Sequence, residues 1–229
     1  TDRGLGRFFH VATNMESSLI TALILFLIVQ PADSVMTGFA LVLAGAVSSA
    51  SKFIIARRGK HIFNPAALAA AMLSLTGLGA TTWWVGSTMM APFALILGMA
   101  VVYKIRRFPL FMTFVLVSTV LQYLLYLGTH QPVVAGIQHA LLASPVIFLA
   151  TIMLTEPATM PPRRNLQIIF ATIVAILYVT AWGIGPFIIY PEVALLIGNL
   201  FAYAVSPKFR VRLQLKEIQQ ISDRVYNYV

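Results

Sequence analysis

The sequence predicts an all-α membrane protein, a polytopic helical bundle of about eight membrane segments with broken helices and an inverted repeat. Three observations indicate this fold: an apolar composition, a one-sided distribution of basic residues and a repeated helix. Of 229 residues, 59% are hydrophobic and 10% are charged, whereas soluble domains are about half apolar and a quarter charged. The sequence has no cysteine, which excludes disulfides and thiolate-bound zinc or iron–sulfur centres within it.

Eight apolar stretches are candidates for membrane helices, which need about 17–25 residues. The first ends at the turn "QPADS", and the second runs into a basic stretch. The third begins at an Asn-Pro pair, the fourth at two tryptophans and the fifth after a basic loop. The sixth is broken, and "GIGPF" separates the seventh from the eighth. The expected ranges are residues 17–30, 35–51, 63–79, 83–103, 108–128, 133–155, 166–182 and 187–205.

The 16 Lys and Arg residues lie near the termini or in alternate loops. The remaining loops, "QPADS", "GLGATT", "GTHQP" and "GIGPF", contain none. Because Lys and Arg favour cytoplasmic loops, both termini are expected in the cytoplasm. Trp83, Trp84 and Trp182 then lie at the outer interface, where aromatic residues gather. This topology explains the net charge of +9 without a nucleic-acid partner.

Two helices carry similar sequences in opposite predicted orientations. "SLITALILFLIVQPA" begins at Ser18 and "SPVIFLATIMLTEPA" begins at Ser144, an offset of 126 residues. Under the charge-derived topology the first runs outward and the second inward. Such a pair is typical of inverted-repeat membrane folds, whose sites lie at interrupted helices. Chance likeness between two apolar helices is the alternative.

The stretch "FNPAALAAAM" predicts a helix that starts at the membrane boundary. Asn64 is a good N-cap and Pro65 a good first-turn residue. The amides of such a helix start favour anionic groups, phosphate included. Small residues such as Ala66, Ala67 and Ala70 allow a backbone or a flat ligand to approach closely.

The stretch "TEPATMPP" at residues 155–162 is the second predicted interruption. Pro157 cannot continue the preceding helix, and Glu156 places a carboxyl group at its end. We interpret this end as part of a site, with an ordinary cytoplasmic loop as the alternative. Glu192, by contrast, is expected at the solvated outer end of the last segment.

Three stretches, "ESSLITALILFLI", "FNPAALAAAM" and "LATIMLTEPATMPPR", resemble segments of the RnfD/NqrB family of membrane flavoprotein subunits, in that family's order. The resemblance spans about residues 14–205. It implies a urea-transporter-like inverted-repeat bundle that carries electrons through flavins. The implied site for a noncovalent flavin, FMN, lies between the repeats and comprises Asn64, Pro65, Ala66, Ala67, Ala70, Ser144, Thr155, Glu156 and Pro157.

The resemblance weakens at the attachment motif for covalent FMN. Family members join FMN to the Thr of D-x-x-[ST]-G-A-T, and "GAT" at residues 79–81 offers Thr81 on the outer face. Leu75 stands at the Asp position and Leu78 at the Ser/Thr position. Covalent attachment at Thr81 is therefore not the expectation.

The end of the chain, "FRVRLQLKEIQQISDRVYNYV", alternates apolar and polar residues as a strand does. It resembles the opening of the flavin-binding barrel in ferredoxin-NADP reductase-type domains. Residues 206–229 are thus expected to begin a cytoplasmic domain that binds FAD and NAD(P)H, and residues 1–205 to form the membrane domain. A short amphipathic tail on the membrane surface is the alternative.

The predicted function is electron transfer from cytoplasmic NAD(P)H, through flavin, into or across a bacterial inner membrane. Expected partners are the bilayer, redox subunits or a quinone. One alternative is a small-solute or ion transporter or channel of urea-transporter-like fold. Another is a haem-containing transmembrane reductase, for which His139 is the candidate ligand because His10, His61 and His130 fall in loops or at helix ends. We find no nucleophile–histidine–acid arrangement and no metal site other than this haem alternative.

Overall fold

The computed structural model describes residues 15–57, 60–79, 81–129, 132–180, 183–184 and 187–206. This part of the chain is helical, as predicted, with two short antiparallel strand pairs. The helices are α2 (Met15–Ile28), α3 (Val35–Ile54), α4 (Pro65–Thr76), η1 (Trp84–Gly86), α5 (Ala91–Ile105), α6 (Phe108–Gly128), α7 (Val133–Leu142), α8 (Val146–Phe148), η2 (Leu149–Met153), α9 (Arg164–Thr180) and α10 (Pro191–Val205). The strands are β1 (Ala56–Arg57), β2 (Lys60–His61), β3 (Gly183–Ile184) and β4 (Phe187–Ile188).

Each of the eight predicted stretches contains a helix, but few of these helices have the length of a full span. Helices α3 and α6 are long and apolar enough to cross a membrane. Helix α7 and the α8–η2 unit meet at a bend of 51°, and together they pass as a third, broken span. Helices α2, α4, α5, α9 and α10 are shorter apolar helices. The predicted reductase-type segment at 207–229, both chain ends, His10, His130 and Trp182 lie outside the described residues.

Local signals explain where several helices begin. Ser34 caps α3, because its hydroxyl accepts from the Thr37 amide while the Thr37 hydroxyl accepts from the Ser34 amide. Proline stands in the first turn of α4, α5, α6 and α10, where a missing amide hydrogen costs nothing. Helix α4 ends at Gly77, whose φ of 68° is the left-handed conformation that glycine adopts easily.

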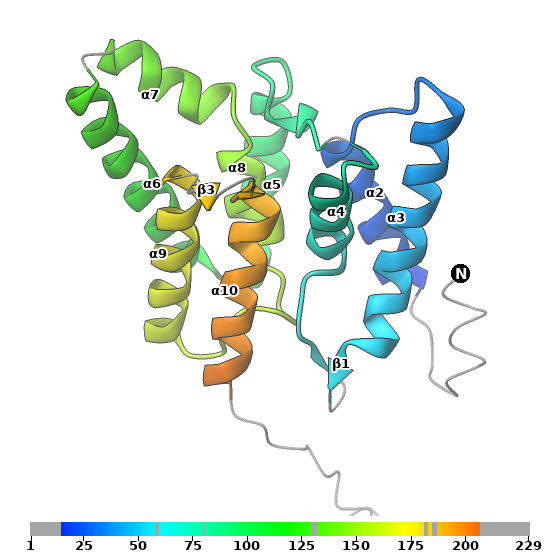
Figure 1. The fold of residues 1–229 in the computed structure, drawn as a ribbon. Coiled ribbons are helices and arrows are strands. Elements are labelled where there is room, and N and C mark those ends of the chain that lie inside the picture. Colours follow the sequence, from blue (N-terminus) through cyan, green and yellow to red (C-terminus); the bar gives the residue numbers. More distant parts are fainter. Residues whose placement is uncertain are drawn as a thin grey trace, which may run out of the picture.

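The helices pack as two hairpins that meet along α4 and α10. Helix α4 stands between α3 and α10, and α10 lies beside α9 (Figure 1). Helices α9 and α10 approach closely, because a Cβ atom on Gly198 would lie 2.4 Å from Val174 Cγ2. Helix α6 packs on the other side of α9.

The offset of 126 residues relates three helices to three others. It carries α2 onto residues 141–154, which contain α8 and η2, and α3 onto residues 161–180, which contain α9. It also carries Pro65, the first residue of α4, onto Pro191, the first residue of α10. The two hairpins α3–α4 and α9–α10 are thus in equivalent places along the chain.

Apolar side chains cover parts of the outer surface as well as the core. On α2 alone, Leu19, Ile20, Leu23 and Phe26 are each more than half exposed. Helices α5 and α6 expose further large apolar residues, among them Phe93, Ile96 and Leu116. Extended apolar patches on a surface mark contact with a membrane or another protein, which agrees with the helices long enough to span a bilayer.

Candidate functional site

A cavity of about 430 Å³ lies where the start of α4 meets the loop that follows η2. It is lined on one side by Asn64, Pro65 and Ala66 and on another by Thr155, Glu156 and Pro157. Six residues of the predicted flavin site therefore surround one space, although about 90 positions separate the two stretches. Volumes of about 300–1,000 Å³ are usual for small-molecule and cofactor sites.

The walls of this cavity are mostly apolar. Helix α2 contributes Ile20 and Ile24, and the end of α5 contributes Val101 and Ile105. Polar groups come from the first turn of α2, where Glu16 and Ser17 lie, and from the residues already named. An apolar space with a few polar groups at one end suits a flat, partly polar ligand.

Asn64 is held in place by both its backbone and its side chain. Its Oδ1 accepts from the Ala67 amide at 3.0 Å, so it is the N-cap that the sequence predicts. Its own amide donates to Asn199 Oδ1 at 3.0 Å. Because Asn64 is 2% exposed, loss of either contact would leave a buried polar group unpaired.

Glu156 is the one residue with a titratable carboxyl group among those that the family resemblance assigns to the site. It lies after the membrane-spanning segment and is partly exposed. Its Oε2 accepts from the Thr159 hydroxyl at 2.9 Å. Burial raises the pKa of Glu156 to about 7, although the hydrogen bonds from Thr159 and Asn64 and the charge of Lys52 act in the opposite direction. The group therefore titrates near neutral pH.

Two buried amide side chains hold the loop that carries Glu156. Asn199, on α10, donates from Nδ2 to the Thr159 carbonyl at 3.3 Å. Gln167, on α9, donates from Nε2 to the Pro161 carbonyl at 2.9 Å. Neither residue was predicted from the sequence. The feature that could have indicated them is an amide side chain within an otherwise apolar helix.

Ala67, Ala70 and Ser144 were predicted for the same site but do not line the cavity. Ala67 and Ala70 are fully buried in the hydrophobic core. Ser144 lies at the bend between α7 and α8, where its hydroxyl donates to the Ala140 carbonyl and accepts from the Tyr178 hydroxyl. Thr155 lines the cavity, but its hydroxyl hydrogen is directed to the Thr151 carbonyl at 2.6 Å.

Thr81 belongs to a different cluster, around Glu192. Glu192 accepts from the hydroxyls of Ser74 and Thr81, at 2.6 and 2.9 Å, and from the Trp83 indole nitrogen at 3.0 Å. The expectation that Glu192 is solvated was wrong, because its exposed fraction is 0%. Trp83 has a φ of 47°, a strained conformation for a bulky residue that these contacts help to hold. Ala80 of the "GAT" stretch lies outside the described residues.

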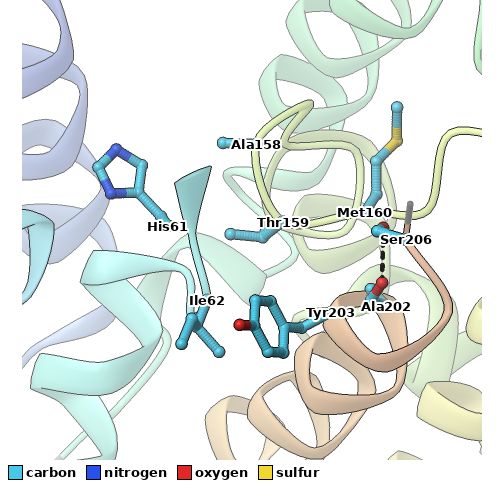
Figure 2. Close-up of a pocket in the computed structure, with 8 residues that line it drawn as sticks. All are labelled: His61, Ile62, Ala158, Thr159, Met160, Ala202, Tyr203 and Ser206. Carbon is cyan, nitrogen blue, oxygen red and sulfur yellow. Dashed lines mark hydrogen bonds between the residues drawn. The ribbon is translucent and has the colours of Figure 1, made fainter. Parts of the chain in front are cut away.

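A second pocket, of about 20 Å³, lies next to the Glu156 loop and is shown in Figure 2. His61, Thr159, Tyr203 and Ser206 are among its lining residues. His139 is elsewhere, exposed on α7. Within the part of the chain that the structure describes, no group of three His, Cys, Asp or Glu residues could hold a metal ion.

Comparison of the chain with protein-family models, with curated proteins and with solved structures finds no match.

Proposed function

We propose that the chain is the membrane part of an electron-transfer protein of the RnfD/NqrB type, with a planar redox carrier bound in the 430 Å³ cavity. Electrons would come from cytoplasmic NAD(P)H, through FAD in a reductase-type domain that residues 206–229 begin. The observation that carries the proposal is the meeting of two stretches, "FNPA" and "TEPA", at that cavity. The sequence resemblance alone assigns both stretches to a flavin site.

The proposed architecture is an inverted repeat of eight membrane segments with both termini in the cytoplasm. Two observations support it: the common offset of 126 residues and the pairing of α4 with α10. Asn64, at the start of α4, contacts Asn199 late in α10, whereas Ser74, late in α4, contacts Glu192 at the start of α10. The two helices are therefore antiparallel, as helices related by a twofold axis in the membrane plane must be.

The cavity fits a noncovalent flavin, FMN, or a quinone. The apolar side chains of α2 and α5 suit the faces of a planar ring. Asn64, Glu156 and the Thr155 oxygen would meet polar ring or ribityl atoms, and the small Ala66 side chain leaves room beside the start of α4. When bound, such a group accepts and passes on electrons, and the protein positions it.

A transporter or channel is the second candidate. It is favoured by the antiparallel short helices α4 and α10, because transporter folds place substrate sites at such paired half-helices. The haem alternative has less support, because the His139 side chain is exposed on α7. A solute site and a flavin site differ in one simple property: a flavin has a visible absorption band.

The test is the absorption spectrum of the purified protein, followed by acid precipitation. We expect a flavin band that leaves with the supernatant, because the proposed site is noncovalent. Ala66→Leu should fill part of the cavity and lower flavin content, whereas Ala22→Leu, at an exposed alanine on α2, should not. A full-length protein with neither a flavin band nor an extractable quinone would overturn the proposal and favour the transporter.

A further inference from the structure

A hydrogen-bonded pair of side chains separates two cavities at the end of the bundle where α4 begins. Glu156 lines the 430 Å³ cavity, and Thr159 lines the 20 Å³ pocket of Figure 2. The Thr159 hydroxyl donates to Glu156 Oε2 at 2.9 Å. One side chain of the pair thus faces each space.

The smaller pocket suits water rather than a ligand. Its 20 Å³ of accessible space is enough for about one water molecule. Ala158, Tyr203 and Ser206, which line it, are partly exposed, so the pocket lies close to solvent. Its lining residues include Thr159 and Ser206, and the Ser206 hydroxyl donates to the Ala202 carbonyl (Figure 2).

We propose that Glu156 exchanges a proton with the occupant of the large cavity, and that Thr159 passes this proton between Glu156 and water in the small pocket. The inference rests on the proposed function in one respect, the assignment of the large cavity to a ligand that gains and loses protons. It adds a role for two side chains and a route that the proposed function does not contain.

The transfer is balanced at every oxygen atom. The Glu156 carboxyl group gives its proton to an acceptor atom in the large cavity, so one O–H bond breaks and one bond to hydrogen forms. The Thr159 hydroxyl then gives its proton to Oε2 and takes one from water in the small pocket, which is replenished from solvent. Glu156 and Thr159 end as they began, one proton has moved from solvent to the cavity, and no electron has moved.

The surroundings of Glu156 agree with this role. Its pKa of about 7 allows both forms near neutral pH, which suits a group that gives and takes protons. The nearby charged and titratable groups are Glu16 on α2, Lys52 on α3 and His61 before α4, with Arg163 and Arg164 exposed at the start of α9. Burial, followed by the charge of Lys52, lowers the pKa of His61, so His61 is neutral when Glu156 titrates.

Infrared difference spectroscopy of the purified full-length protein tests the assignment, because it detects the carboxyl group without any enzymatic turnover. We expect a carboxyl band that is lost with a midpoint near neutral pH and that is absent from Glu156→Gln. A wild-type spectrum in which no carboxyl group titrates near neutral pH, or one unchanged by Glu156→Gln, would overturn the role of Glu156.

Hydrogen–deuterium exchange of the same band tests the route. Thr159→Val removes the hydroxyl and should slow exchange about tenfold or more, equal to a barrier increase of about 1.4 kcal/mol. Thr159→Ser keeps a hydroxyl and should exchange at the wild-type rate, as should Thr180→Val, a control at a partly exposed position on α9. Equally fast exchange in Thr159→Val would overturn the route.

Flavin content measured on the same samples separates this inference from the proposed function. A neutral-pH carboxyl band in a protein that binds no flavin would remove the proposed carrier and retain the proton route. Bound flavin without that band would retain the carrier and remove the route.

Discussion

Two glutamates lie at opposite ends of the α4–α10 pair, and their surroundings differ. Glu192 is 0% exposed, and three side chains donate to its two oxygens. Glu156 is partly exposed, lines a 430 Å³ cavity and accepts from the Thr159 hydroxyl at Oε2. The first carboxyl group joins parts of the fold, and the second has a free space beside it.

Burial alone is therefore a poor criterion for choosing a candidate site carboxyl group in this protein. Glu192 has its acceptor sites used by Ser74, Thr81 and Trp83, so it has little capacity left for a ligand. Glu156 combines a nearby cavity with a pKa shifted to about 7. A perturbed titration beside a pocket is a better indication of a site than a low exposed fraction.

The largest expected effect is the loss of stability on replacing Glu192. Glu192→Ala leaves the buried Trp83 indole N–H without its acceptor and removes the acceptor of the Ser74 and Thr81 hydroxyls, which keep only their mutual contact at 2.9 Å. Each unsatisfied group costs about 1–3 kcal/mol. We expect a total loss on the order of 3–5 kcal/mol, measured by thermal unfolding in detergent. Glu192→Gln retains an acceptor oxygen and should lose less. An Ala variant as stable as the wild type would remove the structural role assigned to this cluster.

Glu156 should make the stability of the protein depend on pH. Its pKa is raised from 4.5 to about 7 in the folded protein, so the folded state holds the proton more tightly. Its contribution is fully present below about pH 4.5 and is lost as pH rises through about 7. At about 1.4 kcal/mol per pKa unit, the difference between 4.5 and about 7 corresponds to roughly 3–4 kcal/mol. Because Glu156 is partly exposed, solvent screening lowers the expected loss to about 2–3 kcal/mol.

Thermal unfolding as a function of pH measures this loss. Glu156→Gln cannot ionise, so its unfolding midpoint should vary less between acidic and mildly basic pH than that of the wild type. Parallel curves for the two proteins would show that Glu156 titrates in the same way in both states.

Substitutions in the alanine run of α4 compare the protein core with the cavity, because some of these alanines lie in the core and one lines the cavity. Ala70→Leu adds volume to a site that is 0% exposed in the core, and overpacking of this kind costs about 1–3 kcal/mol. Ala67→Leu should behave alike. We expect lower unfolding midpoints with unchanged flavin per folded protein, in contrast to Ala66→Leu at the cavity. Flavin loss in Ala70→Leu at full stability would place the carrier deeper along α4.

The smallest expected effect concerns Thr81. Thr81→Val removes one of two hydroxyl donors to Glu192 Oε1, while Ser74 remains. The expected cost is about 0.5–1.5 kcal/mol, measured by thermal unfolding. Flavin should leave with the acid supernatant in both the wild type and the variant. Acid-stable flavin that Thr81→Val abolishes would show covalent attachment at the Glu192 end of the molecule.

Local features of the fold were readable from the sequence. The Asn-Pro pair predicted the N-cap and first turn of α4, and both are present. The Pro157 interruption and the bend of the sixth segment were also predicted, because proline and short polar stretches act on neighbouring residues only. Helix bounds moved by a few residues, and α3 runs to Ile54 rather than to residue 51.

The polar contacts between distant segments could not be predicted from the sequence. The Asn64–Asn199 contact joins residues 135 positions apart, and Ser74–Glu192 joins residues 118 apart. No local pattern shows which polar residue of one helix faces which residue of another. For the same reason Glu192 was placed in solvent, whereas the two stretches at the cavity were brought together by family resemblance alone.

The antiparallel contacts of α4 and α10 have a mechanical consequence. The amide of Asn64 and the hydroxyl of Ser74 bind α10 at two points, near opposite ends of α4. If one helix slid along the other by a turn, about 5.4 Å, both contacts would break together. Sliding of one half of the molecule past the other is therefore opposed near both ends of α4. Such an interface opposes the rocking by which many transporters alternate between two faces, and it agrees with the proposal of a carrier bound at a fixed position.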